Sequence, residues 1–330
     1  MITITGGAGF IGSALVWHLN QMGEENITIV DSLGNSDKWK NLRALRFRHY
    51  IEKEDFLQEL PKLGSQRAIV HLGACSDTTE RDASYLVQNN YEYSKAVIEY
   101  AVENHIRMIY ASSAAVYGDG ARGYDDDPDL VNTLRPLNMY GYSKLMVDHW
   151  AHTRKIMGHV AGLKFFNVFG PNEYHKGHMR SVVHKAWEQI KQDGVVHLFK
   201  SHHPDYTDGE QMRDFVYVKD VVAIICHLID MPALCGFFNV GTGQARSWRD
   251  LTTAVFTALD LPPNIEYIDM PHELRGKYQY FTQAKLDRLR EIVWQQPFTS
   301  LEDAVRDYVI NYLETGSRLG DPDEEFCLRP

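Results

Sequence analysis

Short β-rich runs alternate with helical stretches through the first half of the chain. Strands are predicted at residues 2–5, 27–30, 68–72, 108–111 and 162–167, with helical patterns between them. Strands that are joined through helices need crossover connections, which make the strands parallel and cover both faces of their sheet. The alternation therefore predicts an α/β fold built on a doubly wound parallel sheet.

The pattern becomes irregular after residue 167. A helix is predicted near residues 179–191 and a polar loop at 202–211. Two later runs, 215–218 and 237–240, have the apolar character of buried strands, and we expect both to rejoin the first sheet.

This change of pattern predicts two domains. The larger would comprise residues 1–166 and about 214–240, and the smaller, a discontinuous α/β domain, about 167–213 and 241–314. The last residues are acidic and contain proline, so we expect a loosely held tail over 315–330.

The charge balance narrows the class of protein. With 44 acidic and 34 basic residues the net charge is −10, which argues against a general nucleic-acid binder because such a protein needs a positive face for phosphate. The longest apolar run, residues 221–226, is much shorter than the roughly 20 residues of a membrane span, and the chain does not open like a signal peptide. We therefore expect neither a nucleic-acid nor a membrane partner.

Cysteine and histidine usage gives no sign of a metal site. The four cysteines lack both the spacing of a zinc site and the density of a secreted disulfide scaffold, which favours the cytoplasm. Four histidines have no carboxylate or cysteine beside them at ligand spacing, and we interpret them as polar loop residues: His175, His178, His202 and His203. We predict no metal.

A glycine-rich turn follows the first predicted strand and leads into a helix over residues 11–19. Gly6, Gly9 and Gly12 have the spacing of a dinucleotide-binding turn. The first glycine permits the tight turn, the second lets the backbone approach a pyrophosphate, and the third lets the helix lie close to the strand. The helix N-terminus adds free N–H donors for phosphate. The motif predicts a bound dinucleotide on a Rossmann-type sheet.

The second strand ends at Asp31, where a carboxylate would accept a hydrogen bond from an adenosine ribose and favour NAD. Lys38 and Lys53 lie downstream, where cations could instead neutralise the 2′-phosphate of NADP. Each lysine alone also fits a solvated surface position. The residues leave the choice between NADP and NAD open.

Tyr140 and Lys144 are four residues apart, so on a helix they lie on one face, one turn from each other. A tyrosine is a weak base at neutral pH, but a neighbouring ammonium favours the phenolate. Tyr142 is the less suitable base. Ser113, at the end of the strand over residues 108–111, could polarise a substrate oxygen or merely cap the backbone, and the tyrosine–lysine pair has the alternative of an ordinary core aromatic and a surface lysine.

Together the glycine turn, the serine at the fourth strand and the tyrosine–lysine pair resemble the extended short-chain dehydrogenase/reductase family, with its NAD(P)-dependent epimerases. Further segments narrow the resemblance to the epimerases that invert C6 of an ADP-linked heptose: residues 73–80, 89–91, 136–144, 166–177 and 213–218. The most specific part is His175-Lys176-Gly177 with residues 275–283. The similarity covers residues 1 to about 314.

The resemblance implies a cytoplasmic isomerase that holds NADP, with NAD possible, acts on an ADP-heptose for the lipopolysaccharide inner core, and forms a homo-oligomer, in this family a pentamer. It implies a cofactor site lined by Phe10, Ile11, Asp31, Ser32, Lys38, Lys53, Leu72, Gly73, Ala74, Cys75, Ser76, Asn89, Lys144, Val168 and Lys176. It implies substrate contacts from Asn167, His178, Lys185, Phe199, Lys200, Ser201, His202, Arg213 and Tyr278.

Some positions depart from the family pattern. Leu72 stands where the family often has glutamate, and His178 replaces a smaller polar residue. His184 or Lys185 falls where a substrate-contacting histidine is expected, and the loop 202–211 is longer than expected. These departures concern the adenine and diphosphate contacts more than the chemistry.

The C6–H of a heptose is not acidic, so inversion by simple deprotonation has no stabilised carbanion. Transient oxidation and re-reduction by a bound nicotinamide avoids this difficulty. Tyr140 and Lys176 are the two candidate bases, and a single base with a rotating substrate is the alternative. Arg213 could grip the diphosphate or form an ion pair with Asp214 or Asp220.

Three other activities are the alternatives. A 4-epimerase shares the catalytic pair, and the His-Lys-Gly segment argues against it. A dehydratase of this family would have an Asp-Glu pair where Ala114-Ala115 stands. A non-catalytic dinucleotide sensor would not need the tyrosine–lysine pair.

Overall fold

The computed structural model describes residues 1–275 and 278–322. A seven-stranded sheet forms its centre, in the order β10-β6-β5-β4-β1-β2-β3, and every neighbouring pair is parallel. The strands are β1 (Ile2–Thr5), β2 (Ile27–Asp31), β3 (His49–Glu52), β4 (Ala68–His71), β5 (Arg107–Ser113), β6 (Val160–Phe165) and β10 (Gly236–Val240). The predicted doubly wound parallel sheet is confirmed.

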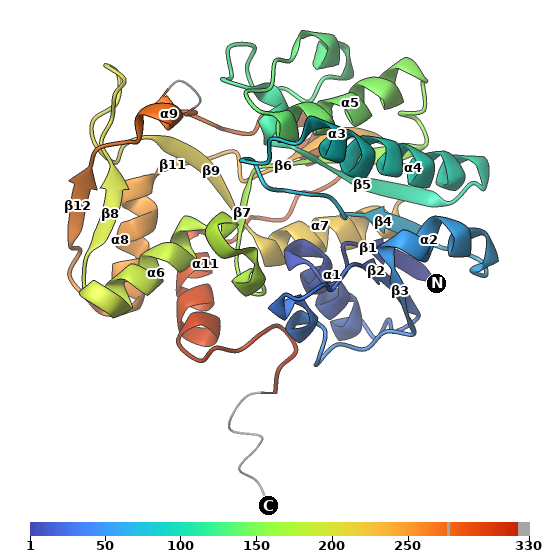
Figure 1. Ribbon diagram of the computed structural model, residues 1–330, viewed down its shortest axis with the longest axis horizontal. Helices are drawn as coiled ribbons and strands as arrows, with labels where there is room; N and C mark the ends of the chain where they lie inside the picture. Colours follow the sequence, from blue (N-terminus) through green and yellow to red (C-terminus); the bar gives the residue numbers. More distant parts are fainter. Residues whose placement is uncertain (276–277, 323–330) are drawn as a thin grey trace, which may run out of the picture.

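Helices cover both faces of this sheet (Figure 1). One face is packed by α1 (Phe10–Gln21) and α7 (Val218–Asp230), which also contact each other. The other face is packed by α2 (Lys53–Glu59), α4 (Tyr93–Glu103) and α5 (Met139–Thr153). The short α3 (Ala83–Leu86) contacts α5. The apolar run at residues 221–226 lies on α7 as part of the core, and Val218, Leu228 and Ile229 of the same helix are also buried there.

Two small sheets lie beside the central one. β7 (Asn167–Phe169), β9 (Met212–Tyr217) and β11 (Ala245–Ser247) form one, and β8 (Val196–Phe199) pairs with β12 (Ile265–Ile268) in the other. The helices of this region are α6 (Val182–Asp193), α8 (Trp248–Ala258), α9 (His272–Arg275), α10 (Asp287–Ile292) and α11 (Leu301–Tyr308).

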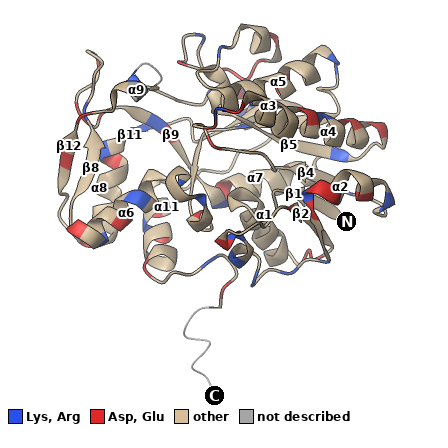
Figure 2. Cartoon of the chain, viewed as in Figure 1, with Lys and Arg blue, Asp and Glu red and all other residues tan. Residues whose placement is uncertain are grey.

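Short helical turns link these elements. They are η1 (Asp37–Asn41), η2 (Leu60–Lys62), η3 (Val87–Glu92), η4 (Ala114–Tyr117), η5 (Pro128–Thr133), η6 (Tyr174–Met179) and η7 (Val309–Leu313). No helix of the described chain is both long and apolar enough to cross a membrane. In the view of Figure 2, acidic and basic residues are interspersed along the elements.

Two expectations about the strands were wrong, and one strand was not predicted. Within the run 215–218, residues 215–217 belong to β9 and do not rejoin the central sheet, because β10 pairs directly with β6 while β9 pairs with β7 and β11; residue 218 begins α7. The run predicted at 162–167 contains the end of one strand and the start of another, since β6 ends at Phe165 and β7 begins at Asn167. β3 was missed because it is a half-exposed edge strand without a buried alternating face.

The described part of the C-terminal segment is firmly packed, so the expectation of a loose tail is wrong for residues 315–322. Leu319 is 1% exposed and its N–H donates to Asn172 Oδ1 at 3.0 Å. Asp321 forms an ion pair with Arg43 at 2.6 Å. Residues 323–330, the rest of that expected tail, lie outside the described residues.

Candidate active site

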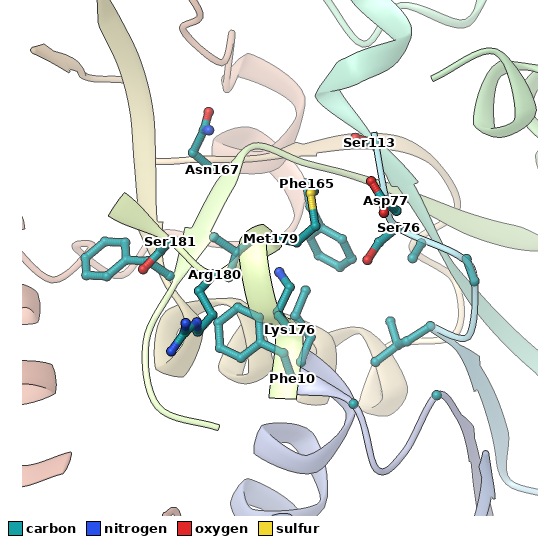
Figure 3. Close-up of a pocket in the computed structure, with 18 of the residues that line it drawn as sticks. Phe10, Ser76, Asp77, Ser113, Phe165, Asn167, Lys176, Met179, Arg180 and Ser181 are labelled. Atoms are coloured by element: carbon teal, nitrogen blue, oxygen red, sulfur yellow. The ribbon is translucent and has the colours of Figure 1, made fainter. Parts of the chain in front are cut away.

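A cavity of about 680 Å³ opens at the carboxyl ends of the central strands. It is bounded by the glycine-rich turn, the start of α5 and the turn η6. Figure 3 shows Phe10 and Lys176 among the side chains that line it. The predicted site residues that line it are Gly6, Gly9, Phe10, Ile11, Gly12, Asp31, Lys38, Leu72, Gly73, Ala74, Cys75, Ser76, Ser113, Tyr140, Lys144, Asn167, Val168, Lys176 and His178. Segments that are far apart in the sequence are thus brought into one cavity.

A smaller cavity of about 200 Å³ adjoins the first at the end of β2. Ser32, Lys53 and Asn89 line it, together with Asp31 and Lys38, which line both cavities. The Lys53 ammonium donates to the Asn89 side-chain oxygen. Every residue that the sequence predicted for the cofactor therefore lines one of two neighbouring cavities.

The glycine-rich turn has the close geometry that a pyrophosphate site needs. Gly6 has φ +68°, a conformation that side chains rarely adopt. A Cβ on Gly12 would lie 2.1 Å from the Gly6 carbonyl oxygen, and one on Gly9 would lie 3.1 Å from the same atom. Helix α1 begins at Phe10, so its first N–H groups, which have no partner within the helix, face this turn. The residues present fit a dinucleotide.

Asp31 holds this turn in position through hydrogen bonds to its backbone. Its carboxylate accepts hydrogen bonds from the N–H groups of Ala8 at 2.8 Å and Ser32 at 2.7 Å. It also pairs with the Lys38 ammonium at 2.9 Å. The side chain is therefore engaged within the protein, with Lys38 held beside it at the border of the two cavities.

Tyr140 lies in the first turn of α5, which Asn138 caps by accepting from the Gly141 N–H at 2.8 Å. The Tyr140 side chain hydrogen-bonds with Ser113, the last residue of β5. Burial raises the Tyr140 pKa, and the Ser113 contact opposes that shift. Ser113 also accepts from the Ala115 N–H at 3.1 Å, so it both caps η4 and contacts the tyrosine.

Lys144 lies one turn further along α5 and is 5% exposed. Its ammonium donates to the Ala111 carbonyl oxygen at 2.9 Å. Burial lowers its pKa to about 8, while the nearby carboxylate of Asp148 acts in the opposite direction. The alternative of a surface lysine is therefore excluded.

Asp148 is a buried residue behind this pair that the sequence analysis missed. It is fully buried and accepts hydrogen bonds from Ser112 at 2.8 Å and Tyr110 at 3.0 Å. The Lys164 ammonium lies 3.9 Å away. Its position, one turn beyond Lys144 on the same helix, was the available signal.

Lys176 lines the same cavity from the turn η6. In Figure 3 its amine points into the space between the labelled side chains, above Phe10. The Lys176 nitrogen lies 5.2 Å from the centre of the Phe10 ring. Burial lowers its pKa, and the charge of Glu173 opposes the shift. Lys176 is therefore a cavity residue rather than a lysine exposed on the surface.

Arg213 does not form either of the ion pairs considered for it. Its guanidinium lies between the rings of Trp248, at 5.5 Å, and Tyr278, at 5.2 Å, and it donates to backbone carbonyls. Asp214 accepts instead from Thr242, Gly243 and Ala284, and Asp220 from Thr299. Arg213 is thus a buried cation directly behind Trp248, which lines the cavity.

The other residues expected to contact the substrate lie outside the lining of both cavities. Lys200 pairs with Asp269 at 3.3 Å, and the Ser201 hydroxyl donates to the His203 carbonyl. The remaining members are Lys185 on α6, Phe199 at the end of β8, His202 in the following loop, and Tyr278, whose hydroxyl accepts from Trp248 Nε1.

Several lining residues escaped the sequence analysis. They are Asp77, Phe165, Phe166, Phe169, Met179, Arg180, Ser181, Val182, Phe215, Trp248 and Leu251. Residues 179–182 begin two positions after the His-Lys-Gly segment, and Phe215 lies in the segment 213–218 that carries the resemblance, so both had a usable signal. Trp248 had none, because only the pairing of β9 with β7 and β11 brings it to the cavity. The described residues include no group of three His, Cys, Asp or Glu side chains arranged to hold a metal.

Comparison with known proteins places this site in a family. A model of the NAD dependent epimerase/dehydratase family matches residues 2–241. The proteins named ADP-L-glycero-D-manno-heptose-6-epimerase from Nitratidesulfovibrio vulgaris (strain DP4) and Fusobacterium nucleatum are 55% and 48% identical to this chain, each over 95% of it and 98% of their own length.

Solved structures agree with these relatives. The Helicobacter pylori protein of the same name aligns with a TM-score of 0.79 at 30% identity, over 94% of this chain and 95% of its own. A UDP-N-acetylglucosamine 4-epimerase from Methanobrevibacter ruminantium also aligns with a TM-score of 0.79, but at 23% identity it shares the fold alone. This chain belongs to the NAD dependent epimerase/dehydratase family, and within it is 40–55% identical to relatives that carry the 6-epimerase name.

Proposed function

We propose that this protein inverts C6 of ADP-D-glycero-D-manno-heptose to give ADP-L-glycero-D-manno-heptose. The observation that carries the proposal is that Tyr140 on α5 and Lys176 on η6 line the same cavity. Two acid–base groups that come from different elements suit a reaction in which the same oxygen must lose and regain a proton on two different sides. The names of the relatives, at 40–55% identity, support the same substrate.

The cofactor of the proposal is NADP. When bound, it supplies a hydride acceptor and donor, so that C6 is oxidised and then reduced on its other face. The glycine-rich turn would hold the pyrophosphate, and Lys38 and Lys53 would hold the 2′-phosphate, because both are cations at the smaller cavity. The engagement of Asp31 with the turn and with Lys38 supports NADP over NAD, since it leaves a cation rather than a free carboxylate facing that cavity.

The chain's own groups would handle the proton. Tyr140, aligned by Ser113, would remove or return the C6 hydroxyl proton on one side of the sugar. Lys144 would favour the phenolate by its charge. Lys176 would do the corresponding work on the other side, because the oxygen changes sides when the intermediate ketone turns over. Desolvation lowers the Lys176 pKa, which leaves a larger fraction of its amine neutral at a given pH and so able to accept a proton.

The test is an incubation of the purified protein with ADP-D-glycero-D-manno-heptose, in deuterium oxide and without added nicotinamide. Proton NMR should show inversion at C6, with the C6 hydrogen remaining protium because a hydride carried by a bound cofactor does not exchange with solvent. Deuterium at C6 would contradict transient oxidation, and no inversion would contradict the proposed activity. Inversion of a UDP-sugar at C4 instead would identify the protein as a 4-epimerase.

Three further properties belong to the proposal. We place the enzyme in the cytoplasm, in lipopolysaccharide inner-core synthesis, and we propose a homopentamer. Analytical ultracentrifugation checks the assembly size. We also propose two domains: a cofactor domain of residues 1–166 and about 214–240, and a substrate domain of about 167–213 and 241–314. Strand β9, which shares a sheet with β7, lies at the boundary between them.

A further inference from the structure

We propose that residues 315–322 act as a strap that positions the turn η6, and with it Lys176, against the dinucleotide loop, with Arg318 as the positioning residue. The inference rests on the proposed function only for its kinetic consequence. The strap itself is a set of contacts, and they can be tested without substrate.

The strap crosses from the end of the chain to the cofactor side of the cavity. It follows α11 and η7 and runs to the N-terminal part of the chain, where its last described part meets η1 (Figure 1). Arg43, next to η1, pairs with Asp321 at 2.6 Å. The N–H of Leu319 donates to Asn172, and Leu319 itself is buried in the main core.

The first anchor on η6 is Tyr174, which begins this turn. Its hydroxyl donates to the Ser317 carbonyl oxygen at 2.9 Å and to that of Tyr312 at 2.8 Å. The Arg318 guanidinium stacks on the Tyr174 ring, 4.7 Å from its centre. The strap therefore contacts both the hydroxyl and the ring face of Tyr174, which lies two positions before Lys176.

The second anchor is Asn41, a 2% exposed side chain at the end of η1. Arg318 Nε donates to its oxygen at 3.3 Å. The Asn41 amide donates in turn to the carbonyl of Ala8, in the glycine-rich turn, and to that of Asn172, each at 3.1 Å. It also contacts His175 Nδ1 at 3.2 Å. A single buried amide thus connects the strap, the glycine-rich turn and the residue before Lys176.

The backbone leading into η6 shows why such support is needed. Asn172 has φ +75°, a left-handed conformation that is uncommon for a residue with a side chain, and Gly177 has φ +53°. Asn172 is held by Ser13 on α1 and by Leu319 of the strap. A six-residue turn with two left-handed residues at or beside it has few hydrogen bonds of its own, so its position depends on the contacts around it.

The test compares Arg318→Ala with a matched control, Arg67→Ala. Arg67 pairs with Asp230 and is 49% exposed, much like Arg43, the 47% exposed partner of Asp321 in the strap, but it lies before β4, at the opposite end of the central strands. Hydrogen exchange followed by mass spectrometry should show faster exchange of the peptide covering residues 172–182 in Arg318→Ala and no change there in Arg67→Ala. Unchanged exchange of this peptide in Arg318→Ala would overturn the proposal that the strap positions η6.

Kinetics decide whether the strap acts through Lys176. In Arg318→Ala we expect turnover to fall about tenfold or more with little change in KM, because a displaced acid–base group slows chemistry rather than binding. The two half-reactions separate the roles: Arg318→Ala should slow reduction of the bound nicotinamide by the epimer that depends on Lys176 and leave reduction by the other epimer unchanged. An equal loss with both epimers would mean that the strap stabilises the fold without positioning Lys176, which overturns the proposal.

A chain that ends at residue 314 provides a second variant, with a chain that ends at residue 322 as its control. The shorter chain should reproduce the exchange and kinetic changes of Arg318→Ala, and the longer should match the full chain. If the shorter chain does not fold, Arg318→Ala alone carries the test. If the full chain does not turn over the ADP-heptose, the proposed function fails, whereas the exchange measurement still decides the strap.

Discussion

The ammonium nitrogen of Lys144 donates a 2.9 Å hydrogen bond to the backbone carbonyl oxygen of Ala111. Ala111 lies in β5 two residues before Ser113, so this bond ties the middle of α5 to the strand end that carries the Ser113 hydroxyl. Tyr140, one turn before Lys144, hydrogen-bonds with that same serine. The three side chains are therefore fixed relative to one another by bonds within the protein.

We predict that Tyr140→Phe lowers turnover by about a hundredfold or more while the protein keeps its cofactor, because only the hydroxyl that exchanges the proton is lost. Turnover is followed by NMR, and bound cofactor by absorbance after denaturation. The control is Tyr142→Phe, at a neighbouring tyrosine that is 51% exposed, which should turn over like the unmodified chain. Similar rates for the two variants would remove Tyr140 from the mechanism.

We predict that Lys176→Met blocks the oxidation step from one C6 epimer but not from the other. In a two-base mechanism each epimer presents its hydroxyl to a different base, so only one epimer should still reduce the bound nicotinamide. The measurement is the near-ultraviolet absorbance of the reduced cofactor after each epimer is added.

Lys191→Met is the matched control for this experiment, because Lys191 is an exposed lysine that pairs with Glu314. It should leave both half-reactions intact. Reduction by both epimers in Lys176→Met would instead support a single base with a rotating substrate.

We predict that turnover falls as the pH rises through about 8. Burial lowers the Lys144 pKa to about 8, so the ammonium loses its proton well below the usual range of a lysine, and a neutral amine no longer favours the Tyr140 phenolate. The carboxylate of Asp148 raises the Lys144 pKa, so Asp148→Asn should move this alkaline limb to lower pH.

The measurement is a pH profile of kcat for the unmodified chain, Asp148→Asn and a control, Asp230→Asn, at an exposed carboxylate that pairs with Arg67. In Asp230→Asn the alkaline limb of the kcat profile should lie at the same pH as in the unmodified chain. A limb that stays fixed in Asp148→Asn would show that Asp148 does not set the charge of Lys144.

We predict that Lys53→Met lowers the affinity for NADP by about tenfold or more relative to the affinity for NAD, because a charge-assisted contact to the 2′-phosphate is lost while the rest of the site is kept. Lys38→Met should have the same direction of effect. Competition between the two cofactors for the apoprotein measures the ratio. Lys40→Met, at a lysine that pairs with Asp37 on η1, is the control and should leave the ratio unchanged. An equal loss of affinity for both cofactors would show that the lysines do not contact the 2′-phosphate.

Local patterns in the sequence predicted the parts of the site whose members are close together along the chain. The spacing of Gly6, Gly9 and Gly12 requires a tight turn between a strand and a helix, and the structure has that turn. The four-residue spacing of Tyr140 and Lys144 places them on one helix face wherever the helix lies. Such features follow from backbone geometry over a single turn, so no tertiary contact is needed to infer them.

Other features depend on contacts between distant segments, and the sequence alone could not decide them. The pairing of β9 with β7 and β11 brings Trp248 to the cavity, although the run 215–218 has the same apolar character as a strand of the central sheet. Arg213 could have formed an ion pair beside it, yet packing between two aromatic rings placed its cation elsewhere. Residues of the C-terminal end, polar enough to suggest a loose tail, are held by Asn41 and Asn172, which lie 277 and 147 positions away.

The sequence by itself thus determined the doubly wound sheet, the glycine-rich turn and the tyrosine–lysine pair on one helix face, because each follows from residues a few positions apart. Only the tertiary structure decided that Lys176 lines the same cavity as Tyr140, and what holds Lys176 in place. Lys176 is a lysine on a short turn until η6 is packed against Phe10, Asn41 and the C-terminal segment. The free energy that selects this arrangement comes from burial and hydrogen bonds that form only when the whole chain has folded.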